Sequence, residues 1–305
     1  MTQSPGPELG TGNSALPLVV SAYAKINLTF EVLGRRSDGL HEVATVLQTI
    51  SLADRLRFSP AKEIRLRHRG LKPTSEDDLI LRAARLLLGR TGLGAGCMIE
   101  CAKRIPLAAG LGGGSADAGA TLRGLNALWK TGLGTVALVE MAAELGADVP
   151  FAIEGGTALG AGTGGTLTDL PDAPPHWVVL VPIASGDVRK TAEMYRRLKP
   201  DDLTGGAAAR RQAAAVASGQ VDYDAVSSAF ARAAAESWPP TAGALRALRE
   251  AQSPAASVSG AGPSVFGLFA KRASAIDGLA SVRAAGLPAR LYRFTRRMPV
   301  SPIEE

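Results

Sequence analysis

A glycine-rich segment, residues 106–119, constrains this chain more than any other part of its sequence. It reads Pro-Leu-Ala-Ala-Gly-Leu-Gly-Gly-Gly-Ser-Ala-Asp-Ala-Gly, between a strand-like run, residues 97–103, and a predicted helix that ends near Trp129. Because glycine has no Cβ, backbone N–H groups in such a loop can approach phosphate oxygens, and the helix N-terminus adds partial positive charge. The segment predicts a phosphate-binding loop, although a flexible surface turn is the simpler alternative.

The spacing of its glycines excludes the two most familiar phosphate loops. Counted from Gly110 or from Gly112, the sixth position is not the glycine that a Rossmann fingerprint requires. A Walker A loop that began at Gly114 would place Ala120 where its lysine must stand. The loop is therefore of another type, and the hydroxyl of Ser115 is available to a phosphate or to Mg²⁺.

Length and hydropathy indicate a globular protein. The chain has 305 residues, 46% of them hydrophobic and 20% charged, which is enough for two ordinary domains. No apolar run reaches the roughly 20 residues that a membrane helix needs. Residues 1–17 are rich in Gly, Pro, Ser and Thr and lack the features of a secretory or transit peptide. We expect a disordered tail there, a cytoplasmic location and no membrane partner.

The formal net charge of +6 favours an acidic partner without identifying it. Nucleic acid is not favoured, because aromatic residues make up only 5% of the chain and no basic run is interleaved with them. A phosphate-bearing small molecule or a merely solvated basic surface remains. Cys97 and Cys101 lie about 13 Å apart on a predicted strand, too far for a disulfide, so we expect two reduced cysteines.

Strand-like and helix-like segments alternate, which predicts an α+β or mixed α/β protein. Asp77 or Asp78 is expected to cap the first helix. A glycine-rich zone, residues 155–165, is interpreted as a change of domain. The predicted strands are 18–30, 43–52, 64–68, 97–103, 177–182 and a strand–loop–strand at 258–267; the predicted helices are 79–88, 136–145, 192–198, 207–218 and 223–237.

Outside the loop, polar residues in apolar surroundings are candidates for chemistry. Lys25 and Asn27 are two apart on a strand and share a face, which is either catalytic or simply exposed. Asp148 follows a helix and precedes a proline, and on its own it is better explained as a cap. The turn at residues 259–264 is common between strands, and His41 by itself is best interpreted as structural.

Taken together, these stretches resemble the motifs of the GHMP kinases in order and spacing. Within that superfamily the match is closest to the 4-diphosphocytidyl-2-C-methyl-D-erythritol kinases of the non-mevalonate isoprenoid pathway. The resemblance runs from about Val20 to Phe269. It is carried by residues 24–28 (Ala-Lys-Ile-Asn-Leu), 36–41 with Gln48, 106–118, 146–151 (Gly-Ala-Asp-Val-Pro-Phe) and 259–263 (Ser-Gly-Ala-Gly-Pro).

This resemblance implies a two-domain architecture. An N-terminal ATP-binding domain similar to ribosomal protein S5 domain 2 would span residues 18–165, and a ferredoxin-like domain would span residues 166–305. ATP and the substrate would lie between them. The implied reaction is the ATP-dependent, Mg²⁺-assisted phosphorylation of the 2-hydroxyl of 4-diphosphocytidyl-2-C-methyl-D-erythritol, by a monomer or weak homodimer.

The resemblance also assigns roles to individual residues. Asp148 would be the general base, and Lys25 would hold it ionised beside the substrate hydroxyl. Ser115 would lie near the metal. Residues expected to wrap the ATP phosphates are Pro106, Ala108, Gly110, Leu111, Gly112, Gly113, Gly114, Ser115 and Ala116. Those expected at the substrate are Asn27 as an orienting donor, His41 at the cytosine edge, Thr191 and Tyr195 against the base, and Gly260 and Gly262.

Two departures from the family pattern weaken parts of this assignment. Leu40 stands where the family usually has an aromatic residue that stacks on cytosine, which would cost about 1–3 kcal/mol of stacking. Asp78 replaces a common Asn and cannot donate to adenine or ribose. Two alternatives therefore stay open: a GHMP kinase acting on homoserine or a mevalonate derivative, and a non-catalytic ATP-binding sensor.

Overall fold

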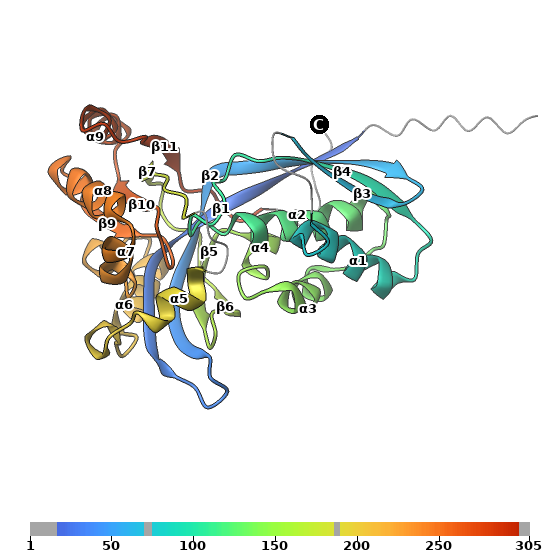
Figure 1. The fold of residues 1–305 in the computed structure, drawn as a ribbon, viewed down its shortest axis with the longest axis horizontal. Helices are drawn as coiled ribbons and strands as arrows, with labels where there is room; N and C mark the ends of the chain where they lie inside the picture. The colour runs from blue at the N-terminus through green and yellow to red at the C-terminus, as the bar shows by residue number, and fades with distance from the viewer. Residues whose placement is uncertain (1–16, 70–74, 186–189, 299–305) are drawn as a thin grey trace, which may run out of the picture.

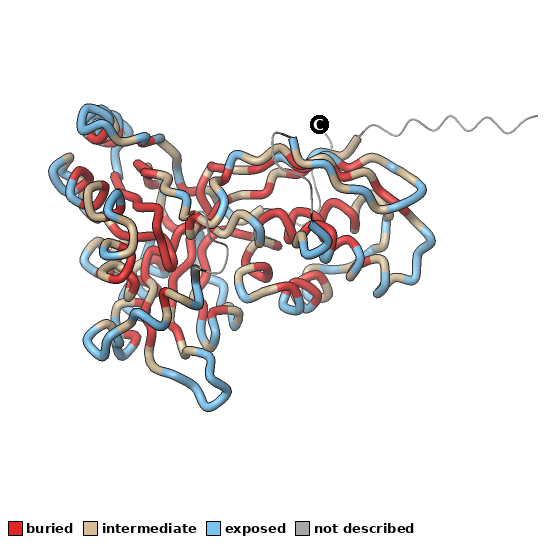
Figure 2. Tube along the Cα trace, in the orientation of Figure 1, coloured by how far each residue is buried: buried red, intermediate tan, exposed pale blue. Residues whose placement is uncertain are grey.

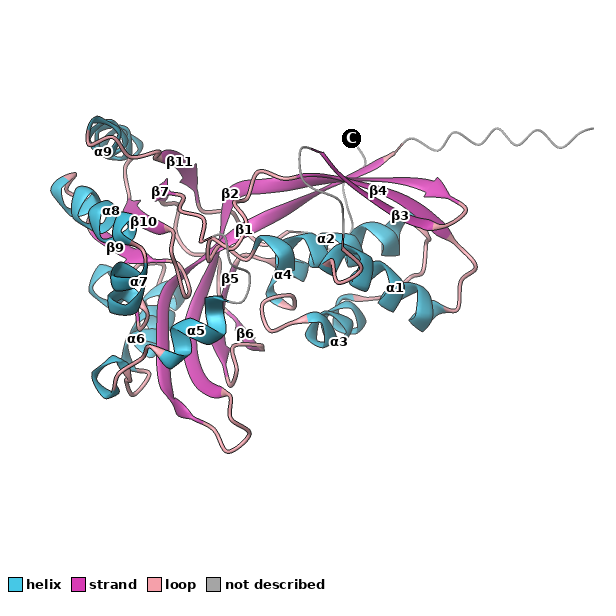
Figure 3. Cartoon of the chain, viewed as in Figure 1, coloured by secondary structure: helices cyan, strands magenta, loops and turns pink. Residues whose placement is uncertain are grey.

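The computed structural model describes residues 17–69, 75–185 and 190–298. The fold is built on two β-sheets: the smaller lies at one end of an elongated molecule, and the larger extends from beside it to the other end (Figure 1). The predicted tail falls outside the described residues except at its last position. Helices and strands are intermingled along the chain, and helices pack beside both sheets (Figure 3). This agrees with the predicted mixed α/β class.

The larger sheet is built on one long antiparallel hairpin. Its arms, β1 (Leu18–Arg35) and β2 (His41–Ala61), extend well past the two predicted strands and enclose the predicted turn. The sheet has seven strands, in the order β3-β4-β2-β1-β8, with β5 paired to β2 and β6 to β5. The other members are β3 (Ile64–Arg69), β4 (Gly96–Ala102), β5 (Thr157–Ala161), β6 (Thr166–Asp169) and β8 (Ser227–Ser228).

Helices α1 (Leu79–Thr91), α2 (Gly113–Leu128), α3 (Thr135–Leu145) and the single turn α4 (Phe151–Glu154) pack beside this sheet (Figure 1). The later helix α6 (Ala207–Ala217) also packs on it, and its Ala213 and Val216 lie in the same core. Glycines let α2 approach its neighbours closely. A Cβ added at Gly124 would lie 2.5 Å from the ring of Phe58 on β2, and one at Gly119 would lie 2.9 Å from the backbone of Ala152 on α4. The small residues in the glycine-rich segment therefore serve packing as well as the loop.

The smaller sheet has ferredoxin-like topology. Its strands β7 (Trp177–Val181), β9 (Ala255–Val258), β10 (Val265–Phe269) and β11 (Arg290–Arg293) pair antiparallel in the order β11-β7-β10-β9. Helical segments follow β7, and a helix joins β10 to β11, which gives the βαββαβ pattern that the resemblance implied. The helices are α5 (Lys190–Arg196), α6 (Ala207–Ala217), α7 (Ala231–Ser237), α8 (Pro239–Glu250) and α9 (Arg272–Ala284).

The long hairpin belongs to both cores. Ile26 and Val46 lie in the core of the larger sheet, whereas Val32 and Val43 lie farther along the same strands in the core of the smaller one. Buried residues run through both cores (Figure 2). The predicted boundary at residue 165 falls in the turn between β5 and β6, which pair with each other. We propose that the boundary lies after β6, at residues 170–176.

One helix prediction is wrong. Residues 223–237 form a 3₁₀ turn (Tyr223–Ala225), the short strand β8 and only then α7. Local composition favours a helix throughout, but Ser227 and Ser228 pair with β1, and the Ser228 hydroxyl donates to the carbonyl of Gly260 at 3.0 Å. Tertiary pairing therefore overrides the helical propensity of this alanine-rich segment.

Other predictions of local structure are confirmed. Asp78 caps α1, its carboxylate accepting from the Ile80 N–H at 2.9 Å. Cys97 and Cys101 are free and buried on β4.

Within the described residues, no helix has both the length and the apolar character to cross a membrane.

Candidate active site

A pocket of about 470 Å³ collects most of the residues that the sequence singled out. The glycine-rich loop forms one wall, and β1, α5 and the turn between β9 and β10 form others. Of the predicted site residues, the pocket is lined by Lys25, Asp148, Pro106, Ala108, Gly110, Leu111, Gly112, Gly113, Gly114, Ser115, Thr191, Tyr195 and Gly260. Segments more than 200 residues apart in the chain thus meet at one site.

The start of α2 is built to receive an anion. Its first intrahelical hydrogen bond runs from the Ala116 N–H to the Gly112 carbonyl at 2.8 Å, so the N–H groups of residues 113–115 precede the helical ladder. No side chain caps this end of the helix. The backbone N–H of Lys25 donates to the carbonyl of Leu111 at 3.0 Å, and this bond holds the loop against β1. Open N–H donors at a helix N-terminus fit phosphate oxygens.

The loop is also bound to the turn between β9 and β10. The Ser259 hydroxyl donates to the Gly110 carbonyl at 2.9 Å, and the Ser264 N–H donates to the Ala109 carbonyl at 3.2 Å. The backbones are so close at Gly110 that an added Cβ would lie 2.3 Å from the Ser259 carbonyl oxygen. These two motifs, 149 residues apart, are therefore in direct backbone contact.

Lys25 and Asp148 meet across the pocket. The Lys25 Nζ lies 3.4 Å from Asp148 Oδ2, 2.8 Å from Asn27 Oδ1 and 3.4 Å from the Gly110 carbonyl. The Lys25 side chain is 9% exposed and that of Asp148 is 39% exposed. Three N–H donors of the ammonium therefore face three acceptors, while the carboxylate keeps a surface open to the pocket.

Asn27 is placed differently from its predicted role as a substrate-orienting donor. Its side chain lies behind Lys25 and is 1% exposed. Its Oδ1 accepts from Lys25, and its Nδ2 donates to the hydroxyl of Thr45 at 2.8 Å. Both polar ends of the Asn27 side chain are thus bound by protein groups, Lys25 and Thr45, instead of being free to orient a substrate.

An aromatic cluster forms the wall near α5. The ring of Tyr195 stacks on that of His41, with 4.4 Å between centroids and 18° between planes. Tyr195 also makes an edge contact with Phe230, with 5.0 Å between ring centroids. Burial and, less strongly, the negative charge of Asp148 raise the pKa of Tyr195 to about 12. His41 therefore occupies a face of Tyr195 on which a base could stack, and Leu40 beside it is 55% exposed.

A buried charge cluster under the loop escaped the sequence reasoning. Lys103 Nζ lies 2.5 Å from both Asp54 Oδ2 and Asp117 Oδ2. Asp54 also accepts from the backbone N–H groups of Arg104 and Ile105, which lead into the loop. Burial outweighs the attraction of Lys103 and raises the pKa of Asp117 to about 8. The only hint in the sequence was Lys103, a basic residue just before the loop. Its two partners could not be identified, because Asp54 and Asp117 lie 49 and 14 residues away from it in the sequence.

Removing this lysine should destabilise the fold. In Lys103→Met the carboxylates of Asp54 and Asp117 stay buried without their cation, so we expect a loss of about 3–5 kcal/mol of unfolding free energy at pH 8. Asp117, whose pKa burial already raises, would then bind a proton more readily than it does in the unfolded chain, so part of the loss should return as the pH falls from 8 towards 4. Urea unfolding across this range measures it. The exposed Lys62→Met variant is the control, and an equal, pH-independent change in both would contradict the prediction.

Some predicted residues lie beside the pocket. Ala116 is buried in α2, and Gly262 packs towards the interior, where an added Cβ would lie 2.9 Å from Val258. Asp78 also has a structural role, since its Oδ2 lies 2.8 Å from His68 Nε2. Lining residues that the sequence reasoning missed are Phe30, Thr45, Leu79, Lys103, Leu107, Ala109, Ala147, Thr163, Gly164, Phe230 and Ala261.

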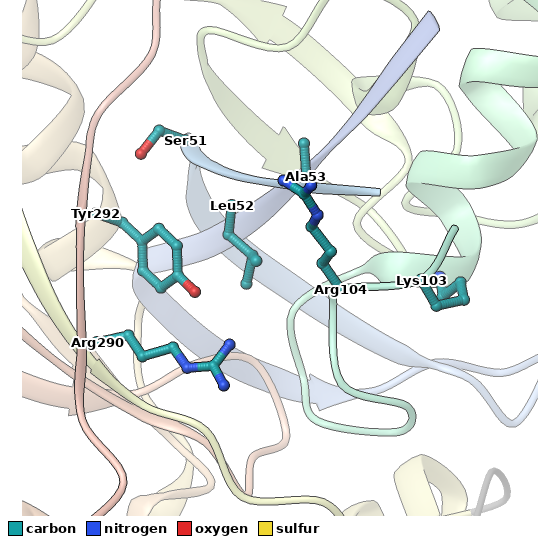
Figure 4. A pocket seen from close by; sticks show the side chains of 7 residues that line it. All are labelled: Ser51, Leu52, Ala53, Lys103, Arg104, Arg290 and Tyr292. Carbon is teal, nitrogen blue, oxygen red and sulfur yellow. The ribbon is translucent and has the colours of Figure 1, made fainter. Parts of the chain in front are cut away.

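A second pocket, of about 540 Å³, is lined by fewer residues and is chemically simpler. Figure 4 shows Arg290 and Tyr292 of β11 facing the space beside Ser51 and Leu52, with Arg104 and Lys103 at its far side. Lys103 is already neutralised by its two carboxylates. The glycine-rich loop and a carboxylate paired with a lysine do not line this pocket, so the first pocket is the stronger candidate for an active site.

Comparison with known proteins gives a consistent result. Residues 78–156 match the family model described as the GHMP kinases N terminal domain. A 4-diphosphocytidyl-2-C-methyl-D-erythritol kinase of Dehalococcoides mccartyi is 40% identical over 253 residues, covering 83% of this chain and 89% of the relative.

Solved structures agree with this match. A crystal structure of 4-(cytidine 5'-diphospho)-2C-methyl-D-erythritol kinase has a TM-score of 0.77 and 33% identity, covering 91% of this chain and 99% of that one. A homoserine kinase from Cytophaga hutchinsonii has a TM-score of 0.70 at 18% identity, covering 95% and 98%, and so shares the fold alone. These likenesses confirm the predicted fold class.

Proposed function

This chain belongs to the 4-diphosphocytidyl-2-C-methyl-D-erythritol kinases of the GHMP kinase superfamily, and we propose that it catalyses the reaction for which these relatives are named. It transfers the γ-phosphoryl group of ATP to the 2-hydroxyl of 4-diphosphocytidyl-2-C-methyl-D-erythritol, in the non-mevalonate route to isoprenoid precursors. The observation that supports the proposed site is the contact of Lys25 with Asp148, facing an uncapped helix N-terminus.

ATP would bind with its phosphates at the loop. The open N–H groups at the start of α2 and the partial positive charge of that helix end would hold phosphate oxygens. Among the described residues, no cluster of three or more His, Cys, Asp or Glu side chains could hold a metal ion by itself. Magnesium, which neutralises phosphate charge, would therefore be held by ATP oxygens together with the Ser115 hydroxyl.

Asp148 would act as the general base. Its partly exposed carboxylate would accept the proton of the 2-hydroxyl while that oxygen attacks the γ-phosphorus, and ADP would leave. Lys25 would hold the carboxylate in place and offset the negative charge that gathers between it and the phosphates. Because Lys25 is held by three acceptors, it would be in position before the substrate binds.

The cytidine end of the substrate would bind at the aromatic cluster. We propose that the base is recognised by His41 and Tyr195, with Thr191 near the start of α5 as a further polar contact. A base that stacks on the face of Tyr195 now covered must displace His41. A homoserine- or mevalonate-type substrate has no aromatic base to fill this wall, which favours the cytidyl substrate.

Substrate preference tests the proposal. We expect Mg²⁺-dependent ADP release from ATP with 4-diphosphocytidyl-2-C-methyl-D-erythritol and only background release with homoserine or mevalonate. CDP should raise the melting temperature of the protein, because a ligand that binds only the folded state stabilises it. A coupled ADP assay and a thermal melt with each compound measure the two effects.

The outcomes separate the alternatives. Release with homoserine or mevalonate in place of the cytidyl substrate would keep the superfamily and overturn the cytidine site. ATP binding without release for any alcohol would favour the non-catalytic sensor. As further parts of the proposal, we keep the cytoplasm as the location and a monomer or weak homodimer as the assembly.

A further inference from the structure

Thr45 lines the pocket, but its hydroxyl binds neither the loop nor Asp148; it completes a buried series of hydrogen bonds that leads to Lys25. Its hydroxyl lies 2.6 Å from the carbonyl oxygen of Thr29 and 2.8 Å from Asn27 Nδ2. Thr45 is 2% exposed and Asn27 is 1% exposed. These contacts are therefore shielded from water and leave few alternative partners.

Each hydrogen bond between Thr29, Thr45 and Asn27 can have only one donor and one acceptor assignment. A carbonyl oxygen can only accept, so the Thr45 hydroxyl must donate its single proton to Thr29. Thr45 can then only accept from Asn27, which forces the amide to turn its NH₂ group towards Thr45 and its oxygen towards Lys25. The orientation of the Asn27 amide thus follows from the backbone carbonyl of Thr29, which can only accept a hydrogen bond.

This orientation decides where Lys25 points. With the amide oxygen towards it, Asn27 is the closest acceptor of the ammonium, at 2.8 Å, and the remaining N–H groups reach Asp148 and the Gly110 carbonyl. With the amide reversed, two donors would face each other and the lysine would be pushed from this position. The geometry points to Thr45 as a positioning residue: we propose that it sets catalysis by fixing, through Asn27, the Lys25 ammonium against Asp148.

The inference rests on the proposed function, and isosteric variants test it. Thr45→Val keeps the side-chain shape, including the methyl group that packs near Gly160, but removes the hydroxyl. It leaves an Asn27 N–H buried without its acceptor, so we expect kcat to fall about 10- to 100-fold. The KM for ATP and for the alcohol should change less than threefold, because the buried Thr45 hydroxyl is already bound to Thr29 and Asn27 and offers nothing to either substrate.

Thr45→Ser keeps the hydroxyl and should retain kcat within about threefold of wild type. Thr168→Val, on the exposed face of β6, is the matched control and should leave kcat unchanged. In an Asn27→Ala background, Thr45→Val should have almost no further effect on kcat, since both residues act through the same hydrogen bond. If Thr45→Val does not fold, Thr45→Ala is compared with Thr45→Ser in the same way.

The results separate this inference from the function itself. A wild-type enzyme that is inactive on the cytidyl substrate defeats the proposed function. An active wild type with an equally active Thr45→Val defeats the positioning role. Equal losses in Thr45→Val and Thr45→Ser, or a full additional loss in the Asn27→Ala background, also defeat it, because a packing role would behave in these ways.

Discussion

Replacing Asp148 by Asn should lower kcat about 10²- to 10⁴-fold, the usual contribution of a positioned general base. The amide keeps the size of the side chain but cannot accept the proton of the substrate hydroxyl in the way a carboxylate does. The affinity for ATP should stay near wild type, because the phosphates are assigned to the loop and α2. Single-turnover phosphorylation and ATP titration measure the two quantities separately.

The control for this variant is Asp277→Asn. Asp277 lies exposed on α9 and does not line the pocket, so the same chemical change there should leave kcat unchanged. A loss in Asp148→Asn that comes entirely from a weaker ATP affinity, with kcat retained, would contradict the role of base. It would indicate that the carboxylate acts on the nucleotide instead.

Replacing Gly110 by Ala should disrupt both the fold and the site. Gly110 has φ +83°, and an added Cβ would lie 2.3 Å from the Ser259 carbonyl oxygen and 2.7 Å from that of Gly262. All of these atoms belong to backbone, so neither loop can relieve the clash by a side-chain rotation. We expect a loss of about 2–5 kcal/mol of unfolding free energy, from left-handed strain and overpacking together.

Gly132 offers a matched control for the strain alone. It has φ +70°, but nothing lies within 4 Å of an added Cβ. Gly132→Ala should therefore cost only about 1–2 kcal/mol, and its ATP affinity should not change. Urea unfolding and ATP binding by calorimetry compare the two variants. Equal destabilisation, with ATP binding intact in both, would show that the two loops are not fixed together at Gly110.

The sequence by itself determined the local parts of the molecule. Glycine spacing, the cap at Asp78 and the apolar periodicity around α1, α3 and β7 depend on neighbouring residues, so each could be predicted within a few positions. The same holds for the loop before α2. The ordered set of motifs also indicated the family and its two-domain fold, which the topology of the smaller sheet and the likeness to solved structures confirm.

Only the tertiary structure decided which polar groups meet. The helix predicted over residues 223–237 gives way to β8 because β1 supplies a partner that local propensity cannot reveal. The Asn27 amide is bound by Lys25 and by Thr45 of the neighbouring strand, and Lys103 lies between two carboxylates from different elements. Hydrogen bonds and charges act over a few ångströms in space whatever the separation in sequence, so these contacts exist only once the sheets and helices have packed.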